Sequence, residues 1–130
     1  MRVEKATYAL LVGGSGITAL VGTRIYPRRL PQNHTLPALV YSLISAPREL
    51  NHSGAESLVT ARVQVTAHAS TYAVAKSVQN AVQSRADGYS GTVGGVVVDK
   101  VYTEDGPDGY DPTTETEQAV TDLLISYQET

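Results

Sequence analysis

The chain has 130 residues, of which 42% are hydrophobic and 18% charged, a size and composition typical of one globular domain. Its formal net charge is −3 at pH 7 and its basic residues are spread along the sequence, which disfavours tight binding of duplex DNA. Cysteine is absent, so disulfides, cysteine zinc sites and thiol catalysis are excluded. The longest nearly apolar stretch, residues 36–47, is too short to span a bilayer. We therefore expect one soluble domain over residues 1–130 and no membrane association.

The apolar residues are mostly small, because Val and Ala dominate, Phe and Trp are absent, and Tyr is the only aromatic type. Small side chains bury little area each, so the core of a single subunit is expected to be thin. Tyrosine suits positions that are dry at one end of the ring and wet at the other, as interfaces are. The composition favours a chain that gains burial by association with neighbouring subunits.

The first third of the chain predicts a helix, a short turn and an extended arm. A helix is expected over residues 2–12, because one face carries apolar residues and a threonine at three- and four-residue spacing: Val3, Ala6, Thr7, Leu10 and Leu11. Gly13 and Gly14 end it, and residues 15–22 predict a single helical turn. Prolines at 27, 31 and 37 interrupt regular structure, so residues 26–36 are expected to form an extended, partly rigid arm.

Two strands follow the arm. Residues 38–45 are apolar on both faces, as in a central strand. Residues 48–57 are polar and predict a hairpin connection. Residues 58–68 show the clearest alternation in the chain, with Val63 among the residues of the buried face and Arg62 among those of the wet face.

The last half of the chain predicts one more helix and two more strands. Ser70 or Thr71 can cap a helix whose apolar stripe comprises Val74, Ala75, Val78, Ala81 and Val82 and ends before Gly88. Residues 92–103 predict a strand with a bulge at Gly94 and Gly95. An acidic loop is expected over residues 104–116 and a closing strand over residues 118–128.

The resulting order is helix, strand, strand, helix, strand, strand. Short connections such as residues 48–57 require antiparallel neighbours. We therefore predict an α+β fold with a mainly antiparallel sheet of about four strands and two helices packed on one face.

The sequence contains no specific catalytic or metal-binding pattern. The glycines at 13, 14 and 16 follow a helix and lack the Lys-Ser/Thr ending of a phosphate loop, so they are interpreted as a helix stop. Ser15 lacks the second glycine of a nucleophile elbow. His34, His52 and His68 have no spacing that builds a metal site or a triad, and we expect each to be exposed. The sequence predicts neither an enzyme nor a bound cofactor.

Two charged segments remain as candidates for binding. Glu104, Asp105, Asp108 and Asp111 lack the order of an EF-hand loop. They are interpreted either as a solvated hairpin tip or as a wall that keeps DNA phosphates from sticking in a passage. In the arm, Arg28 and Arg29 form either an ordinary solvated loop or a docking site for carboxylates or phosphates.

Several passages spread along the chain belong together as one pattern. In the first half they are the leading helix and three passages, Ala19–Pro27, Leu30–Gln32 and Leu36–Tyr41. In the second half they are four passages: Ala61–Val65, Thr71–Ala75, Tyr110–Pro112 and Asp122–Tyr127. Through these passages nearly the whole sequence resembles the tail-completion, or tail-terminator, proteins of long-tailed bacteriophages, which also occur in prophages and gene transfer agents.

The resemblance implies an α+β subunit of a six-membered ring at the head-proximal end of the tail tube. Such a ring stops tube growth and joins tail to head, so the implied partners are copies of this chain, the tail tube protein and a head-completion or stopper protein. DNA would pass through without specific binding, and the protein would be made in the host cytoplasm and reside in the virion. The candidate interface residues are Tyr26, Arg28, Arg29, Arg48, Glu49 and Tyr110, and the candidate lumen residues are Glu104, Asp105, Asp108 and Asp111.

Two alternatives stay open. The first is a head-completion or stopper protein of the same connector, which binds the portal side rather than the tube side. The second is a small-molecule-binding α+β domain, which would show a deep pocket with convergent polar groups.

Overall fold

The computed structural model describes residues 2–45, 57–113 and 115–129, and these residues form an α+β fold. Within them lie three helices: α1 (Arg2–Val12), α2 (Ser15–Val21) and α3 (Tyr72–Ala86). The same residues form seven strands: β1 (Ile25–Pro27), β2 (Ala38–Ser45), β3 (Ser57–Ala69), β4 (Gly91–Val93), β5 (Val96–Asp105), β6 (Gly109–Asp111) and β7 (Thr116–Glu129). None of these helices is long and apolar enough to cross a membrane.

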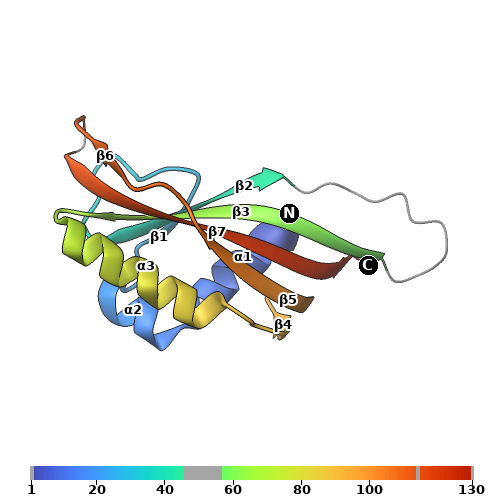
Figure 1. Cartoon of the computed structure of the whole chain (residues 1–130). Helices are drawn as coiled ribbons and strands as arrows, with labels where there is room; N and C mark the ends of the chain where they lie inside the picture. Colours follow the sequence, from blue (N-terminus) through green and yellow to red (C-terminus); the bar gives the residue numbers. More distant parts are fainter. Residues whose placement is uncertain (1, 46–56, 114, 130) are drawn as a thin grey trace.

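The strands form one curled sheet in the order β1-β2-β3-β7-β5-β4, and β6 pairs with β7 beside the end of β5 (Figure 1). Strands β3 and β7 form the long central pair of this sheet. Their pairing runs from Ser57 opposite Glu129 to Ala69 opposite Glu117. The β1–β2 pair is parallel, whereas every other pair is antiparallel. The sheet is therefore mixed.

The three helices cover one face of the sheet, and no helix of the described residues lies on the other face (Figure 1). The alternation predicted for β3 is confirmed: its residues at odd-numbered positions from Val59 to Ala69 are buried beneath the helices, and the intervening residues from Thr60 to His68 are half-buried or exposed. In β7 the helix-facing residues are Ala119, Thr121, Leu123, Ile125 and Tyr127, all buried. We call the uncovered side the open face.

Helix α3 packs on β3 and β7, as its apolar stripe predicts. Thr71 is the cap, since its hydroxyl oxygen accepts a hydrogen bond from the Val74 amide at 3.3 Å. The Val74 side chain itself is exposed, so its place in the predicted stripe is wrong. Gln79 is buried instead, and its Nε2 donates to the Val120 carbonyl at 2.8 Å, which satisfies a polar group inside the core.

The glycines after α1 allow a close approach by α3. Arg85 Nε donates to the Leu10 carbonyl at 2.9 Å, and a Cβ at Gly14 would lie 2.9 Å from the Arg85 side chain. A residue larger than glycine would obstruct this contact. Gly13 and Gly14 therefore end α1, as predicted, and make room for the arginine that ties α1 to α3.

The sheet has more strands than the sequence analysis predicts, and there is one more helix. The predicted strand over 92–103 is a hairpin, because Gly94 and Gly95 have φ of 59° and 78° and reverse the chain rather than form a bulge. Residues 15–21 form helix α2 rather than a single turn. Pro27, predicted to lie in the arm, ends the edge strand β1, where the missing amide hydrogen is tolerated. The predicted connection 48–57 lies almost entirely outside the described residues.

Candidate interaction surfaces

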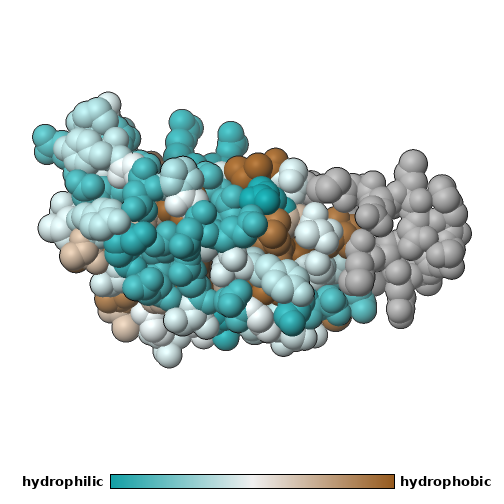
Figure 2. Space-filling view, in the orientation of Figure 1, coloured by the Kyte–Doolittle hydropathy of each residue, from teal (hydrophilic) through white to brown (hydrophobic). Residues whose placement is uncertain are grey.

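The open face carries polar side chains from neighbouring strands. Across β3 and β7 most outward positions are polar, and they hold Thr60, Arg62, Gln64, Thr66, His68, Gln118, Val120, Asp122, Leu124, Ser126 and Gln128. A sheet face of this composition does not require a second hydrophobic layer. Figure 2, seen from the same side as Figure 1, shows that α3 and the β6 end of the molecule are also mainly hydrophilic.

A charged cluster lies at the centre of the open face. Arg62 donates from Nη1 to Asp122 Oδ2 at 2.5 Å and from Nη2 to Glu104 Oε1 at 3.1 Å. The hydrogen bond to Asp122, and then that to Glu104, raises the pKa of Arg62. The second carboxylate oxygen of Asp122 is buried and has no hydrogen-bond partner among the described residues. The cluster joins β3, β5 and β7. Neither the spacing of these residues in the sequence nor the composition predicts that they meet.

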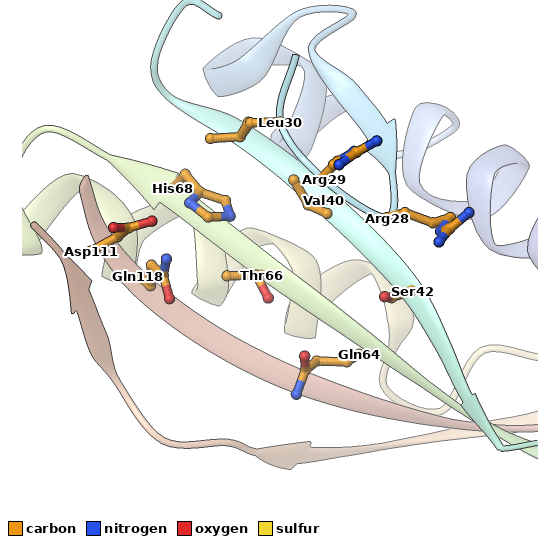
Figure 3. Close-up of a pocket in the computed structure, with 10 residues that line it drawn as sticks. All are labelled: Arg28, Arg29, Leu30, Val40, Ser42, Gln64, Thr66, His68, Asp111 and Gln118. Carbon is orange, nitrogen blue, oxygen red and sulfur yellow. The ribbon is translucent and has the colours of Figure 1, made fainter. Parts of the chain in front are cut away.

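A hollow of about 340 Å³ lies on the open face between the arm and β6 (Figure 3). Its lining comes from the arm (Arg28, Arg29, Leu30), from β2 (Val40, Ser42), from β3 (Gln64, Thr66, His68) and from β6 and β7 (Asp111, Gln118). Most of these side chains are polar, whereas pockets for small molecules are mostly apolar. The hollow therefore has the character of a protein-docking surface more than that of a ligand pocket.

His68 is half-buried in this hollow, so the prediction that it is exposed is wrong. Burial is the main cause that lowers its pKa; nearby His34 lowers it further, and Asp111 opposes the shift. His34 belongs to the arm and is also half-buried. The arm folds back over the end of β3, which the position of His68 in an alternating strand could not reveal.

Backbone contacts hold both ends of the arm. Arg24 Nε donates to the Pro37 carbonyl at 2.9 Å, and the Arg28 amide donates to the Tyr41 carbonyl at 2.8 Å. Arg28 has a φ of 72°, a conformation that side-chain-bearing residues rarely adopt. These two hydrogen bonds restrain the ends of the arm, in agreement with the partial rigidity that its prolines predict. The sequence pattern does not predict the part that Arg24 plays.

The candidate interface residues of the arm are accessible. Tyr26 is half-buried, and Arg28 and Arg29 are exposed. Neither arginine forms an ion pair within the described residues, and both guanidinium groups point away from His68 and Asp111 (Figure 3). Tyr110 is 54% exposed on β6, apart from these arginines in the sheet order. Arg48 and Glu49 lie outside the described residues.

The sequence predicts that the four candidate lumen carboxylates lie in one loop. In the structure they do not, because two of them belong to β5 and one to β6. Glu104 and Asp105 belong to β5, where adjacent residues face opposite sides of the sheet. Glu104 meets Arg62 on the open face, whereas Asp105 accepts a hydrogen bond from Gln83 of α3. The structure therefore separates these two neighbours.

The other two carboxylates are separated in the same way. Asp108 lies against α3, where it accepts from the Tyr72 hydroxyl at 2.7 Å and from Lys76 Nζ at 3.3 Å. The hydrogen bond from Tyr72 is the main cause that lowers the pKa of Asp108. Asp111 of β6 lines the hollow. Only Glu104 and Asp111 are thus associated with the open face.

Within the described residues, no group of three or more His, Asp or Glu side chains is arranged to hold a metal ion. No curated protein sequence matches this chain. A solved structure, "Virion of native gene transfer agent (GTA) particle", contains a chain with the same fold: the TM-score is 0.70 at 17% sequence identity, over 98% of this chain and 95% of that one. The model of the family described as "Tail completion protein gp17" matches residues 5–128, so this chain belongs to that family of phage tail structural proteins.

Proposed function

We propose that this protein is a subunit of a closed ring of six copies that completes the head-proximal end of a tail tube. The ring stops tube growth and presents a surface to which the head connector binds. It acts as a structural element of the virion, without catalysis, after synthesis in the host cytoplasm. Membership of the tail completion family supports the tail as its location.

The observation that carries this proposal is the two-sided character of the sheet. Three helices cover one face, while the open face is mainly polar and carries no helix in the part of the chain that the structure describes. A subunit of a ring around a water-filled channel needs such a face, because the channel-facing side must remain hydrated while the opposite side closes the core. We therefore place the open face toward the channel and the helices toward the outside.

The charges of the open face suit a passage for DNA. On β3, β5, β6 and β7 the open face carries Glu104, Asp111 and Asp122 beside Arg62 and Lys100, so carboxylates outnumber cations on these strands, whereas Arg28 and Arg29 lie in the arm at its rim. A weakly negative wall repels phosphates and forms few lasting contacts with them. The proposal keeps Glu104 and Asp111 as channel residues. Asp105 and Asp108 are assigned to the helix side, where Gln83, Tyr72 and Lys76 hold them.

The test is deletion of the gene from the phage or particle that carries it, with the intact gene supplied in trans as the control. We expect over-long tail tubes and unjoined heads and tails in the deletion, and normal particles after complementation. Tails of normal length that merely fail to join would favour a stopper on the head side. Normal infectious particles without the gene would contradict both roles.

A further inference from the structure

Basic and acidic residues are segregated along the sequence, and the strand order places the two groups at opposite edges of the sheet. Residues 24–45 contain three arginines and no Asp or Glu, whereas residues 99–122 contain eight carboxylates and a single lysine. The first segment forms β1, the arm and β2 at one side of the sheet, and the second includes β5 and β6 at the other. Between β1 and β5 lie four strand spacings, or roughly 19 Å.

The basic edge consists of Arg28 and Arg29, which directly follow β1. Both are exposed and lack an ion pair within the described residues. The Arg28 amide is anchored to Tyr41, so the backbone that carries the two guanidinium groups is held in place. These groups point away from the molecule's own His68 and Asp111 (Figure 3). They are presented outward rather than used internally.

The acidic edge consists of Asp87, Asp99 and Asp105, on β5 and just after α3. All three are exposed and none forms an ion pair within the described residues, although Asp105 accepts a hydrogen bond from Gln83 on the helix side of β5. Asp87 Oδ1 accepts from the amide and hydroxyl of Thr103 at 3.3 and 3.2 Å, which directs it to the edge of β5. Strand β4 pairs with β5 at residues 96–98, and beyond them the segment after α3 runs along the same edge: the Gly88 amide donates to the Val101 carbonyl at 2.8 Å and the Val101 amide donates to the Tyr89 carbonyl at 3.0 Å.

We propose that Arg28 and Arg29 of one subunit contact carboxylates of the acidic edge (Asp87, Asp99 and Asp105) of a second copy of this chain, and that the remaining carboxylate, about 20 Å away along β5 in the case of Asp99 and Asp105, adds to the negative charge of this edge. The inference rests on the proposed ring, because a ring joins two different surfaces of each subunit, which must be complementary and lie on different sides. The basic and acidic edges satisfy both conditions. Guanidinium groups also suit carboxylates in geometry, since they can donate two parallel hydrogen bonds.

Contacts of this kind direct which surfaces meet and how fast they meet, and salt screens them. Reversal of charge on one edge should therefore block assembly without affecting the fold. Reversal on both edges should restore attraction, because the contact would be re-formed with its signs exchanged. This rescue separates a contact between copies from a contact with some other tail or head protein.

The experiment compares Arg28→Glu/Arg29→Glu, Asp99→Lys/Asp105→Lys and the four-residue combination. Each full-length variant is supplied to the deletion strain, and rings on isolated tails are counted by electron microscopy. Thermal melting of the purified proteins checks that they fold. Glu115→Lys serves as the matched control, because it reverses an exposed charge outside both edges.

We expect each double variant to melt like the parent and to lower infectious titre at least tenfold, and the combination to recover most of that loss. Parent-like titres from both double variants, with rings present, would overturn this inference and leave the ring proposal standing. Loss of titre without rescue would also overturn it and assign the arginines to another partner. Absence of rings with the parent protein would overturn the ring proposal and this inference together.

Discussion

Replacement of Val63 by aspartate tests the core of this fold most severely. Val63 is fully buried at the centre of β3, where it pairs with Leu43 of β2 and Leu123 of β7 beneath the helices. Val63→Asp forfeits about 1.5–3 kcal/mol of side-chain burial. It also places a polar group without a partner in the core, at a cost of about 1–3 kcal/mol even when the carboxyl is neutral. The sum, about 3–6 kcal/mol, is comparable to the whole stability of about 5–15 kcal/mol expected for a domain.

Urea unfolding followed by circular dichroism measures this loss. With a slope of about 1–3 kcal/mol per M, we expect the midpoint to fall by roughly 2 M or the protein to be unfolded without urea. Thr60→Asp is the matched control on the same strand, because Thr60 is exposed on the open face and should change stability by only about 0.5 kcal/mol. Equal midpoints for the two variants would refute the assignment of the faces of β3.

Three smaller effects follow from local structure. Burial lowers the pKa of His68 below its ordinary 6.5, so the unfolded state binds a proton at a higher pH than the folded state does. The free energy of unfolding should therefore decrease as the pH falls below about 6.5. We expect His68→Gln to remove this contribution, measured as the difference between the urea midpoints at pH 7.5 and pH 5.5. The Tyr72 hydroxyl lowers the pKa of Asp108, so Tyr72→Phe should raise that pKa in a carboxyl NMR titration. Gly106→Ala would place a Cβ 2.6 Å from the Val120 side chain of β7, so it should destabilise the protein by about 1–3 kcal/mol. In Gly16→Ala, within α2, the new Cβ meets nothing within 4 Å, so this variant should stabilise the protein by up to about 1 kcal/mol. Urea unfolding measures both changes.

The elements that could be predicted from sequence are those long enough to show a period. Helix α1 and strand β2 have the predicted bounds, β3 is one residue longer at each end, and α3 begins after the predicted cap Thr71 and ends before Gly88. Strands β1, β4 and β6 have three residues each, too few for any alternation to be recognised. The Gly94-Gly95 pair is compatible with either a bulge or a turn, and only its positive φ angles decide between them.

The candidate site was less predictable, because it depends on contacts between distant residues. The alternation in β3 predicts only that Arg62 lies on the solvent-facing side of the strand. In the structure it binds Asp122 and Glu104, which are 60 and 42 positions away in the sequence. Glu104 and Asp105 would have been assigned to opposite faces had the strand before them been extended to its true end. The resemblance to tail-completion proteins is confirmed by the family match, since it depends on motifs spread along the chain rather than on one local site.

The central claim is that this chain forms a closed ring at the head-proximal end of a tail, with its open face toward the channel. Cryo-electron microscopy of assembled particles tests it most directly, because the map locates every copy of the chain and its orientation. The account predicts six copies in a closed ring between the last tube layer and the head connector, with β3 and β7 on the channel side and α3 outside. Copies at the distal end of the tail, an open arrangement, or a ring with α3 facing the channel would contradict it.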